Sequence, residues 1–458
     1  MPEPARNPFL RGALPAIFAR TALPIIFVMG MNGLLTVVDA LFLGHFAGEA
    51  ALAAVTLIFP LYMLIVALAT LVASGMASIL ARLLGAGRRD AAREIFARAH
   101  WLALAAGVAL IALHALLGGA LVVRVAGADP ALAAPAALYL RILVLFAPLQ
   151  FLLAVNSDAL RSEGRAGFMA AASLLVSLGN IAFDYLLIAR LDLGVAGSAF
   201  GTVLAQALAL GIILAARARG GMALGLPALR RNATLAGSGG MLALGAPQSL
   251  GFLGIALVSS AILLRLQTLA LPDYPATVAA YGIVTRVLTF AFLPLLGLSQ
   301  AMQSIVGNNH GAGLAERVRG AVRLALGCAF VYGAAVEALA MGFAAPIGGL
   351  FVADPRVIAE VAAILPVMVT LYVLTGPHMM VAAWFQALGD APRAALLGLA
   401  KPYLFTLPLI VLLPHLLGPR AIWWAMPGAE ALLALLTLAV LWRAIRARNP
   451  ARARAVRP

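Results

Sequence analysis

Residues 51–93 read ALAAVTLIFPLYMLIVALATLVASGMASILARLLGAGRRDAAR, and this stretch decides the fold. Its first 31 residues, 51–81, carry no charged side chain. A helix needs about 20 consecutive apolar residues to cross a bilayer, so this run is long enough to span one. The run ends at a Gly-Ala-Gly motif, residues 85–87, with four arginines between 82 and 93. The pattern predicts a transmembrane helix that ends in a basic loop.

The rest of the chain has the same character. Of its 458 residues 64% are hydrophobic and 11% are charged, whereas an ordinary soluble domain has roughly 25% charged residues. A soluble fold cannot bury so much apolar surface, and the apolar runs are continuous rather than alternating as in a transmembrane barrel. The single cysteine, Cys328, excludes an internal disulfide and a cysteine-based metal site. The composition predicts an all-α polytopic membrane protein.

Polar breaks divide the chain into twelve apolar segments, which we interpret as twelve transmembrane helices. They lie near residues 16–44, 51–81, 95–122, 132–156, 167–189, 195–216, 238–268, 277–306, 320–346, 358–386, 394–417 and 421–443.

The basic residues give the spans a direction. With this map, 25 of the 32 Lys and Arg residues fall at the two termini and in one alternate set of loops. The positive-inside rule therefore predicts that both termini are cytoplasmic, in a multi-pass protein of the plasma (inner) membrane. Because the charges alternate with spans and form no single patch, we expect the bilayer and not nucleic acid to be the partner.

The second half of the sequence repeats the first at an offset near 226 residues. Gly-Ala-Gly at 85–87 aligns with Gly-Ala-Gly at 311–313, and Arg93 aligns with Arg319. Six spans per repeat predict two parallel lobes, residues 1–216 and 241–458, joined by a cytoplasmic linker over 217–240. Two such lobes around a central cavity are typical of a carrier that works by alternating access.

Charged and polar side chains inside the spans mark the candidate site. Asp39 and Asp184 each lie about five residues from the outer end of a span, or roughly 8 Å deep. Asn180 is one turn from Asp184 on the same helix face, and Thr202 lies at a similar depth in the next span. Two carboxylates this close require either a proton on one of them or a bound cation. Their oxygen ligands suit a small hard cation such as Na⁺.

Other partners for the buried acids are open at this point. Asp39 and Asp184 could pair instead with Arg141 and Arg286, the two arginines that lie within spans. We expect Asp158 to pair with Arg161, and expect Glu337 and Glu430 to be satisfied locally or near an interface. The second half has no acids that match Asp39 and Asp184, which confines the predicted ion site to the N-terminal lobe.

Several motifs resemble those of the multidrug and toxic compound extrusion (MATE) antiporters. They are NIAFDYLLI at 180–188 with GVAGSA at 194–199, TVVD at 36–39, and GNNHGAG at 307–313. The resemblance covers nearly the whole chain and implies efflux of organic, often cationic, compounds coupled to H⁺ or Na⁺. It implies cation binding by Asp39, Asn180, Asp184 and Thr202, and a bend at Pro24. Another branch of the family uses acids in spans 7 and 8, which this chain lacks, so the resemblance favours the branch with an N-lobe site.

The central cavity of such a carrier would bind the exported compound. We predict that six residues on cavity-facing spans contact it: Tyr139, Gln150, Met169, Arg286, Gln300 and Gln303. We predict no cofactor beyond the coupling ion, and a chain that acts as a monomer.

Three other classes fit the sequence less well. A lipid or oligosaccharide-lipid flippase of the same superfamily would need more basic residues at depth than Arg141 and Arg286. The major facilitator fold also has two parallel six-helix halves, but its loop signature is only loosely matched at 85–89. A membrane enzyme would need a catalytic motif, and no paired aspartates for diphosphate chemistry, zinc motif or Ser/Lys dyad is present. We therefore expect an antiporter and no enzyme.

Overall fold

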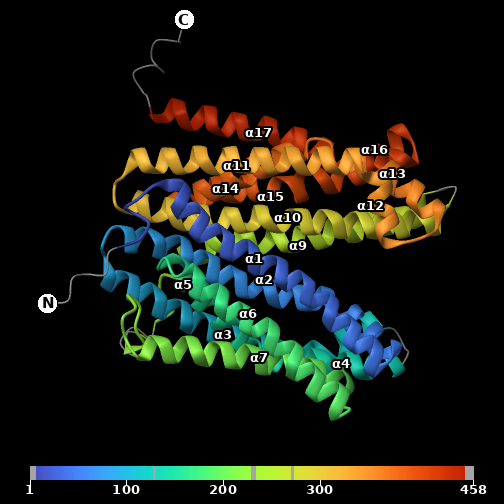
Figure 1. Ribbon diagram of the computed structural model, residues 1–458, viewed down its shortest axis with the longest axis horizontal. Helices are drawn as coiled ribbons and strands as arrows, with labels where there is room; N and C mark the ends of the chain where they lie inside the picture. The colour runs from blue at the N-terminus through green and yellow to red at the C-terminus, as the bar shows by residue number, and fades with distance from the viewer. Residues whose placement is uncertain (1–6, 127–129, 228, 230–233, 270–272, 449–458) are drawn as a thin grey trace, which may run out of the picture. The chain divides into compact units, whose positions relative to one another are not determined.

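The computed structural model describes residues 7–126, 130–227, 229, 234–269 and 273–448, and within them it is helical and contains no strand (Figure 1). The first half comprises α1 (Leu14–Phe42), η1 (Leu43–Ala47), α2 (Glu49–Gly85), α3 (Arg89–Ala126), α4 (Pro130–Leu145), α5 (Ala147–Ser162), α6 (Ala166–Asp184), η2 (Tyr185–Arg190) and α7 (Gly194–Ala218). The second comprises α9 (Gly239–Thr268), α10 (Tyr274–Gly311), α11 (Ala315–Gly342), α12 (Ala344–Phe351), α13 (Pro355–Val369), α14 (Tyr372–Leu388), α15 (Ala391–Leu399), η3 (Ala400–Thr406), α16 (Leu407–Leu417), η4 (Pro419–Trp424) and α17 (Ala425–Arg448).

The helices confirm the predicted all-α membrane class. Among the described residues, ten helices are long and apolar enough to cross a bilayer, and two bent pairs raise the number to as many as twelve. The bent pairs are α4 with α5, at 49°, and α13 with α14, at 43°. They correspond to the spans predicted over 132–156 and 358–386.

Each bend has a local cause. Helix α5 has a proline, Pro148, in its first turn, and proline cannot donate the backbone hydrogen bond that would continue α4. Between α13 and α14, Leu371 adopts a left-handed φ of 68°. The carboxylate of Glu337 accepts hydrogen bonds from the freed N–H groups of Leu371, at 3.1 Å, and Val373, at 2.8 Å. Glu337 therefore caps a broken span, which agrees with the expectation of a locally satisfied acid.

The chain forms two compact units whose borders cut through helices. Unit 1 comprises Met1–Leu253, Gln300–Ala321 and Ala387–Gly389, and unit 2 comprises Gly254–Ser299, Val322–Gln386 and Asp390–Pro458. In unit 1, α2 packs against α3, α4 and α5, while α6 packs against α1 and α7. The buried core between α2, α3 and α5 includes Ile58, Met76, Phe96 and Phe151.

Glycines allow the two sequence repeats to meet closely within unit 1. A Cβ atom at Gly85 would overlap the backbone carbonyl of Asn308, and one at Gly311 would overlap the carbonyl of Arg82. These contacts are reciprocal, because the repeat offset of about 226 residues relates Gly85 to Gly311 and Arg82 to Asn308. The two Gly-Ala-Gly motifs therefore pack against each other where α2 crosses the end of α10. Only glycine permits backbones to approach so closely.

A polar network that includes Arg161, Gln300 and Arg317 surrounds this crossing. We call this region the basic end of unit 1. Arg161, whose side chain is 1% exposed, pairs with Asp158 at 2.9 Å, which confirms the predicted pair. It also donates to the Gln300 carbonyl at 2.7 Å and to Gln303 Oε1 at 3.2 Å. Nearby, the carbonyl oxygen of Phe9 accepts hydrogen bonds from Asn309 at the end of α10, at 3.2 Å, and from Arg317 at the start of α11, at 3.1 Å.

Unit 2 is built around α17. This helix packs along η3, and α13 packs against α12 and α17. A small apolar core joins α14, α15 and α17 through Val381, Phe385, Leu397 and Val440.

Candidate functional site

Helices α6 and α7 hold three of the four predicted cation ligands together. Asn180 and Asp184 are both buried on α6, and Asn180 Nδ2 lies 3.4 Å from Asp184 Oδ1. The same amide donates to Thr202 Oγ1 on α7 at 3.2 Å. A carboxylate, an amide and a hydroxyl therefore meet at one point, as their spacing predicts.

Asp39 reaches the same point from α1, which packs against α6. Its carboxyl group lies close enough to that of Asp184 for the two to interact. Two carboxyl groups this close cannot both be charged at low cost unless a proton or a cation lies between them. The Oδ1 atom of Asp39 is buried with no hydrogen-bond partner in the structure. This oxygen could therefore bind a proton or a small cation. That the two aspartates bind one stays a prediction.

The backbone changes its winding beside both aspartates. The π-helical segment η2 begins directly after Asp184, and η1 begins four residues after Asp39. Short π-helical segments are rare in proteins and often occur at functional sites. On the facing helix, a Cβ atom at Gly201 would overlap Asp184 Oδ1, so glycine at this position lets α7 approach the carboxylate.

The Gly201 contact gives a prediction that changes no charge. Gly201→Ala should push the Asp184 carboxylate out of place and slow gradient-driven transport by about tenfold, which corresponds to an overpacking cost of about 1.4 kcal/mol. Gly211→Ala, in the same helix but with open space at its Cβ position, is the matched control and should transport at the wild-type rate. Equal rates for the two variants in proteoliposomes would show that the close approach of α7 is dispensable.

Two residues predicted for the substrate cavity lie beside the aspartates. Tyr139 lies close enough to Asp39 and Asp184 to interact electrostatically with their carboxyl groups. Gln150 lies beside Tyr62, which itself lies near Asp39. Sequence reasoning missed Tyr62, although a tyrosine within the uncharged run 51–81 is a signal that could have identified it.

The other predicted residues lie elsewhere. Met169 is buried on the α6 face that also carries Asn180, and Gln303 is 3% exposed in the Arg161 network together with Gln300. Pro24 lies within α1, which continues through it without a break. Arg286 is exposed in unit 2.

Arg141, the arginine of unit 1 that the ion-pair alternative names, is not paired with the aspartates. Arg141 is exposed, and within unit 1 it forms no ion pair with Asp39 or Asp184, all three of which are described. Arg286 belongs to unit 2, where its side chain is also exposed. Within unit 1, the geometry favours a shared proton or a cation over an ion pair with Arg141.

A second buried charge cluster lies in unit 2. Glu430 on α17 is 3% exposed, receives a hydrogen bond from His378 Nδ1 at 2.7 Å, and forms an ion pair with Lys401 Nζ. Lys401 lies in the π-helical segment η3, inside the span predicted over 394–417. Glu430 is therefore satisfied locally, as expected, but by a lysine from another part of the membrane-spanning region.

We expect the Lys401–Glu430 ion pair to stabilise the protein, and the removal of one partner alone to destabilise it. Lys401→Met would leave Glu430 buried with only His378 as a partner, and we expect it to destabilise the protein by about 3–5 kcal/mol. The double variant Lys401→Met/Glu430→Gln removes both charges and should recover most of the loss. Thermal melting of the purified proteins checks this; a single variant that melts with the wild type would contradict it.

The chain is similar to known exporters over nearly its full length. It is 24% identical over 432 residues to the multidrug export protein MepA of Staphylococcus aureus, which covers 92% of each chain. It is 25% identical over 440 residues to an FAD transporter of Shewanella oneidensis, which covers 94% of this chain and 95% of the relative.

Solved structures show the same arrangement of helices. A multidrug resistance MATE family transporter in an outward-facing conformation superposes with a TM-score of 0.87 at 25% identity, over 97% of this chain and 98% of that one. The MATE multidrug transporter DinF-BH, solved in complex with R6G, superposes with a TM-score of 0.84 at 29% identity, over 94% and 96%. The MatE family model matches residues 24–186 and 269–412. This match spans more than half of the chain, which therefore belongs to the MatE family of membrane transporters and is not an enzyme.

Proposed function

We propose that the protein is a secondary active antiporter that exports organic compounds, chiefly amphipathic cations, in exchange for H⁺ or Na⁺. The cluster of Asp39, Asp184, Asn180 and Thr202, in which two carboxyl groups lie close together, carries this proposal. A site with two adjacent carboxyl groups can bind one proton, release it to water, and bind a cation in its place. Asn180 and Thr202 add the neutral oxygen ligands that a Na⁺ ion would use.

Alternating access would link this site to transport. The reciprocal Gly85 and Gly311 contacts, together with the Arg161 network, support a closed basic end in this conformation. We place this end and both termini in the cytoplasm of a cell with the carrier in its inner membrane, as the charge asymmetry predicts. The two sequence repeats, 1–216 and 241–458, would then rock about the linker 217–240.

The class of exported compound has two candidates among the relatives. MepA is named for multidrug export and DinF-BH was solved with R6G, which favours organic compounds of varied structure. The Shewanella oneidensis relative is named for FAD, an anionic dinucleotide, and this favours a second, anionic class. Carboxyl groups near Tyr139 and Tyr62 support the cationic class, because they attract ammonium groups.

Purified protein in proteoliposomes tests the proposal. We expect an imposed pH gradient or Na⁺ gradient, applied separately, to drive movement of a fluorescent organic cation, and FAD movement to remain at the level of empty liposomes. Asp192→Asn is the control, since this exposed acid lies in the short turn after η2, and it should behave as wild type. Transport that neither gradient accelerates would refute antiport, and gradient-driven FAD movement alone would assign the anionic class.

A further inference from the structure

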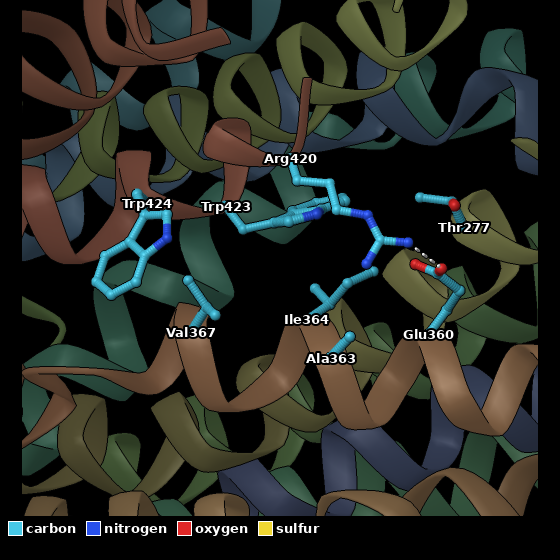
Figure 2. Close-up of a pocket in the computed structure, with 8 residues that line it drawn as sticks. All are labelled: Thr277, Glu360, Ala363, Ile364, Val367, Arg420, Trp423 and Trp424. Atoms are coloured by element: carbon cyan, nitrogen blue, oxygen red, sulfur yellow. Dashed lines mark hydrogen bonds and ion pairs between the residues drawn. The ribbon is translucent and has the colours of Figure 1, made fainter. Parts of the chain in front are cut away.

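A small pocket opens at one end of unit 2. Its walls come from the start of α10, from α13 and from η4, and its volume is about 140 Å³. Figure 2 shows Arg420 reaching from η4 toward Glu360 on α13, with Trp423 and Trp424 beside it. The pocket contains aromatic, acidic and basic groups within one small space.

The polar groups of the pocket can each meet a ligand. Glu360 and Arg420 are paired at 3.0 Å, but their side chains are 19% and 63% exposed, so both charges face the opening. An exposed pair of this kind contributes little stability and can open at small cost. The indole of Trp423 is held in place by stacking on Tyr281, with ring centroids 5.7 Å apart, whereas Trp424 is 51% exposed.

The pocket is too small to bind the large organic compounds that we propose the protein exports. Drug-sized molecules bind in cavities of roughly 300–1,000 Å³, whereas a cavity near 150 Å³ holds a group the size of benzene. The pocket therefore fits a small ion pair, such as a headgroup, and not a large amphipathic cation.

The neighbouring surface is suited to lipid chains. Leu416 and Leu417 end helix α16 immediately before η4, and they are 63% and 73% exposed. Tryptophans at the end of a span mark the level of the lipid headgroups. A molecule with its polar group in the pocket could extend its apolar chains along this leucine surface.

We propose that this pocket binds the headgroup of a zwitterionic phospholipid such as phosphatidylethanolamine. Arg420 would bind the phosphate, and Glu360 would bind the ammonium group against the indole rings of Trp423 and Trp424. Lipid binding breaks the Arg420–Glu360 ion pair and forms two others, Arg420 with the phosphate and Glu360 with the ammonium group. The two new ion pairs compensate for the one that is lost. A lipid with an anionic headgroup lacks the ammonium group and leaves Glu360 facing a like charge.

Native mass spectrometry of the delipidated full-length protein tests the pocket. The probes are phosphatidylethanolamine and phosphatidylglycerol with identical acyl chains, mixed in equal amounts. We expect the wild type to retain the ethanolamine lipid preferentially, and Glu360→Gln and Arg420→Gln each to reduce that preference by roughly threefold to tenfold. Both side chains are at the surface opening, so both variants should melt at the wild-type temperature.

The matched control is Arg356→Gln, at the same end of unit 2. Arg356 is 74% exposed and lies outside the pocket, where its hydrogen bonds to Asp354 lower the pKa of that carboxyl. It should leave the lipid preference unchanged. Equal retention of both lipids by the wild type, or an unchanged preference in Glu360→Gln and Arg420→Gln, would overturn the proposal. Displacement of the lipid by an equal concentration of soluble glycerophosphoethanolamine would overturn the assignment to a membrane lipid.

Discussion

Asp184→Asn should reduce gradient-driven export by about 100-fold, the equivalent of about 2.7 kcal/mol, while the protein still folds. Asparagine keeps the shape of the side chain and its contact with Asn180, but it cannot share a proton with Asp39. Asp39→Asn should have the same effect. Because the two residues act on one proton or cation, the double variant should lose little more than either single one.

Transport assays and melting curves together decide this prediction. A folded Asp184→Asn that exports at the wild-type rate under an imposed gradient would remove this residue from coupling. Asn180→Ala and Thr202→Ala remove neutral ligands only, so they should weaken the dependence on the cation while export continues. If either aspartate variant failed to insert, a structural role would be the better explanation, since loss of a buried partner destabilises membrane proteins strongly.

Gly85→Ala should open the basic end of unit 1. The added methyl group would overlap the Asn308 carbonyl, and relief of that overlap costs about 1–3 kcal/mol. We expect maleimide to label Ser304→Cys, which is 1% exposed in the wild type, roughly tenfold faster in the Gly85→Ala background. Cys328→Ser serves as the common parent, because Cys328 is exposed.

The repeat supplies a second test and a control for this crossing. Gly311→Ala meets the Arg82 carbonyl in the reciprocal contact and should have the same effect as Gly85→Ala. Gly327→Ala, within α11 and with open space at its Cβ position, should leave labelling unchanged, and alanine there favours the helix by up to about 1 kcal/mol. Slow labelling in both crossing variants would mean that the helices adjust without opening.

Depth and helix spacing were enough to predict the membrane class and to group the site residues. Asp39, Asn180, Asp184 and Thr202 could be placed together because rise per residue and a four-residue interval depend on the sequence alone. The rotation of a helix about its own axis does not depend on the sequence of that helix alone. For that reason the sequence could not show that Gln303 lies in the buried Arg161 network, or that the Arg286 side chain is exposed on α10.

Interactions between distant spans were also beyond the reach of one sequence. Lys401 lies within a predicted span, and only the packing of η3 against α17 shows that it pairs with Glu430 inside the membrane region. The bend between α13 and α14 depends on Glu337, which is 34 residues from Leu371 along the chain. Likewise, Gly197 and Gly201 form a small-xxx-small pair that predicts a close approach of two helices, but the sequence does not show that Gly201 faces the Asp184 carboxylate.

The π-helical segment after Asp184 has a consequence for how this site can change during evolution. A π-helical turn accommodates one residue more than an α-helical turn, so η2 is equivalent to a single-residue insertion in α6. Deletion of one residue between 185 and 190 would restore regular α-helix and rotate the outer end of that helix by about 100° relative to Asp184. The side chains from Tyr185 to Arg190 would then face different neighbours while the carboxylate kept its place. Single-residue length differences here are therefore a route by which homologous carriers could acquire new outer surfaces around an unchanged ion site.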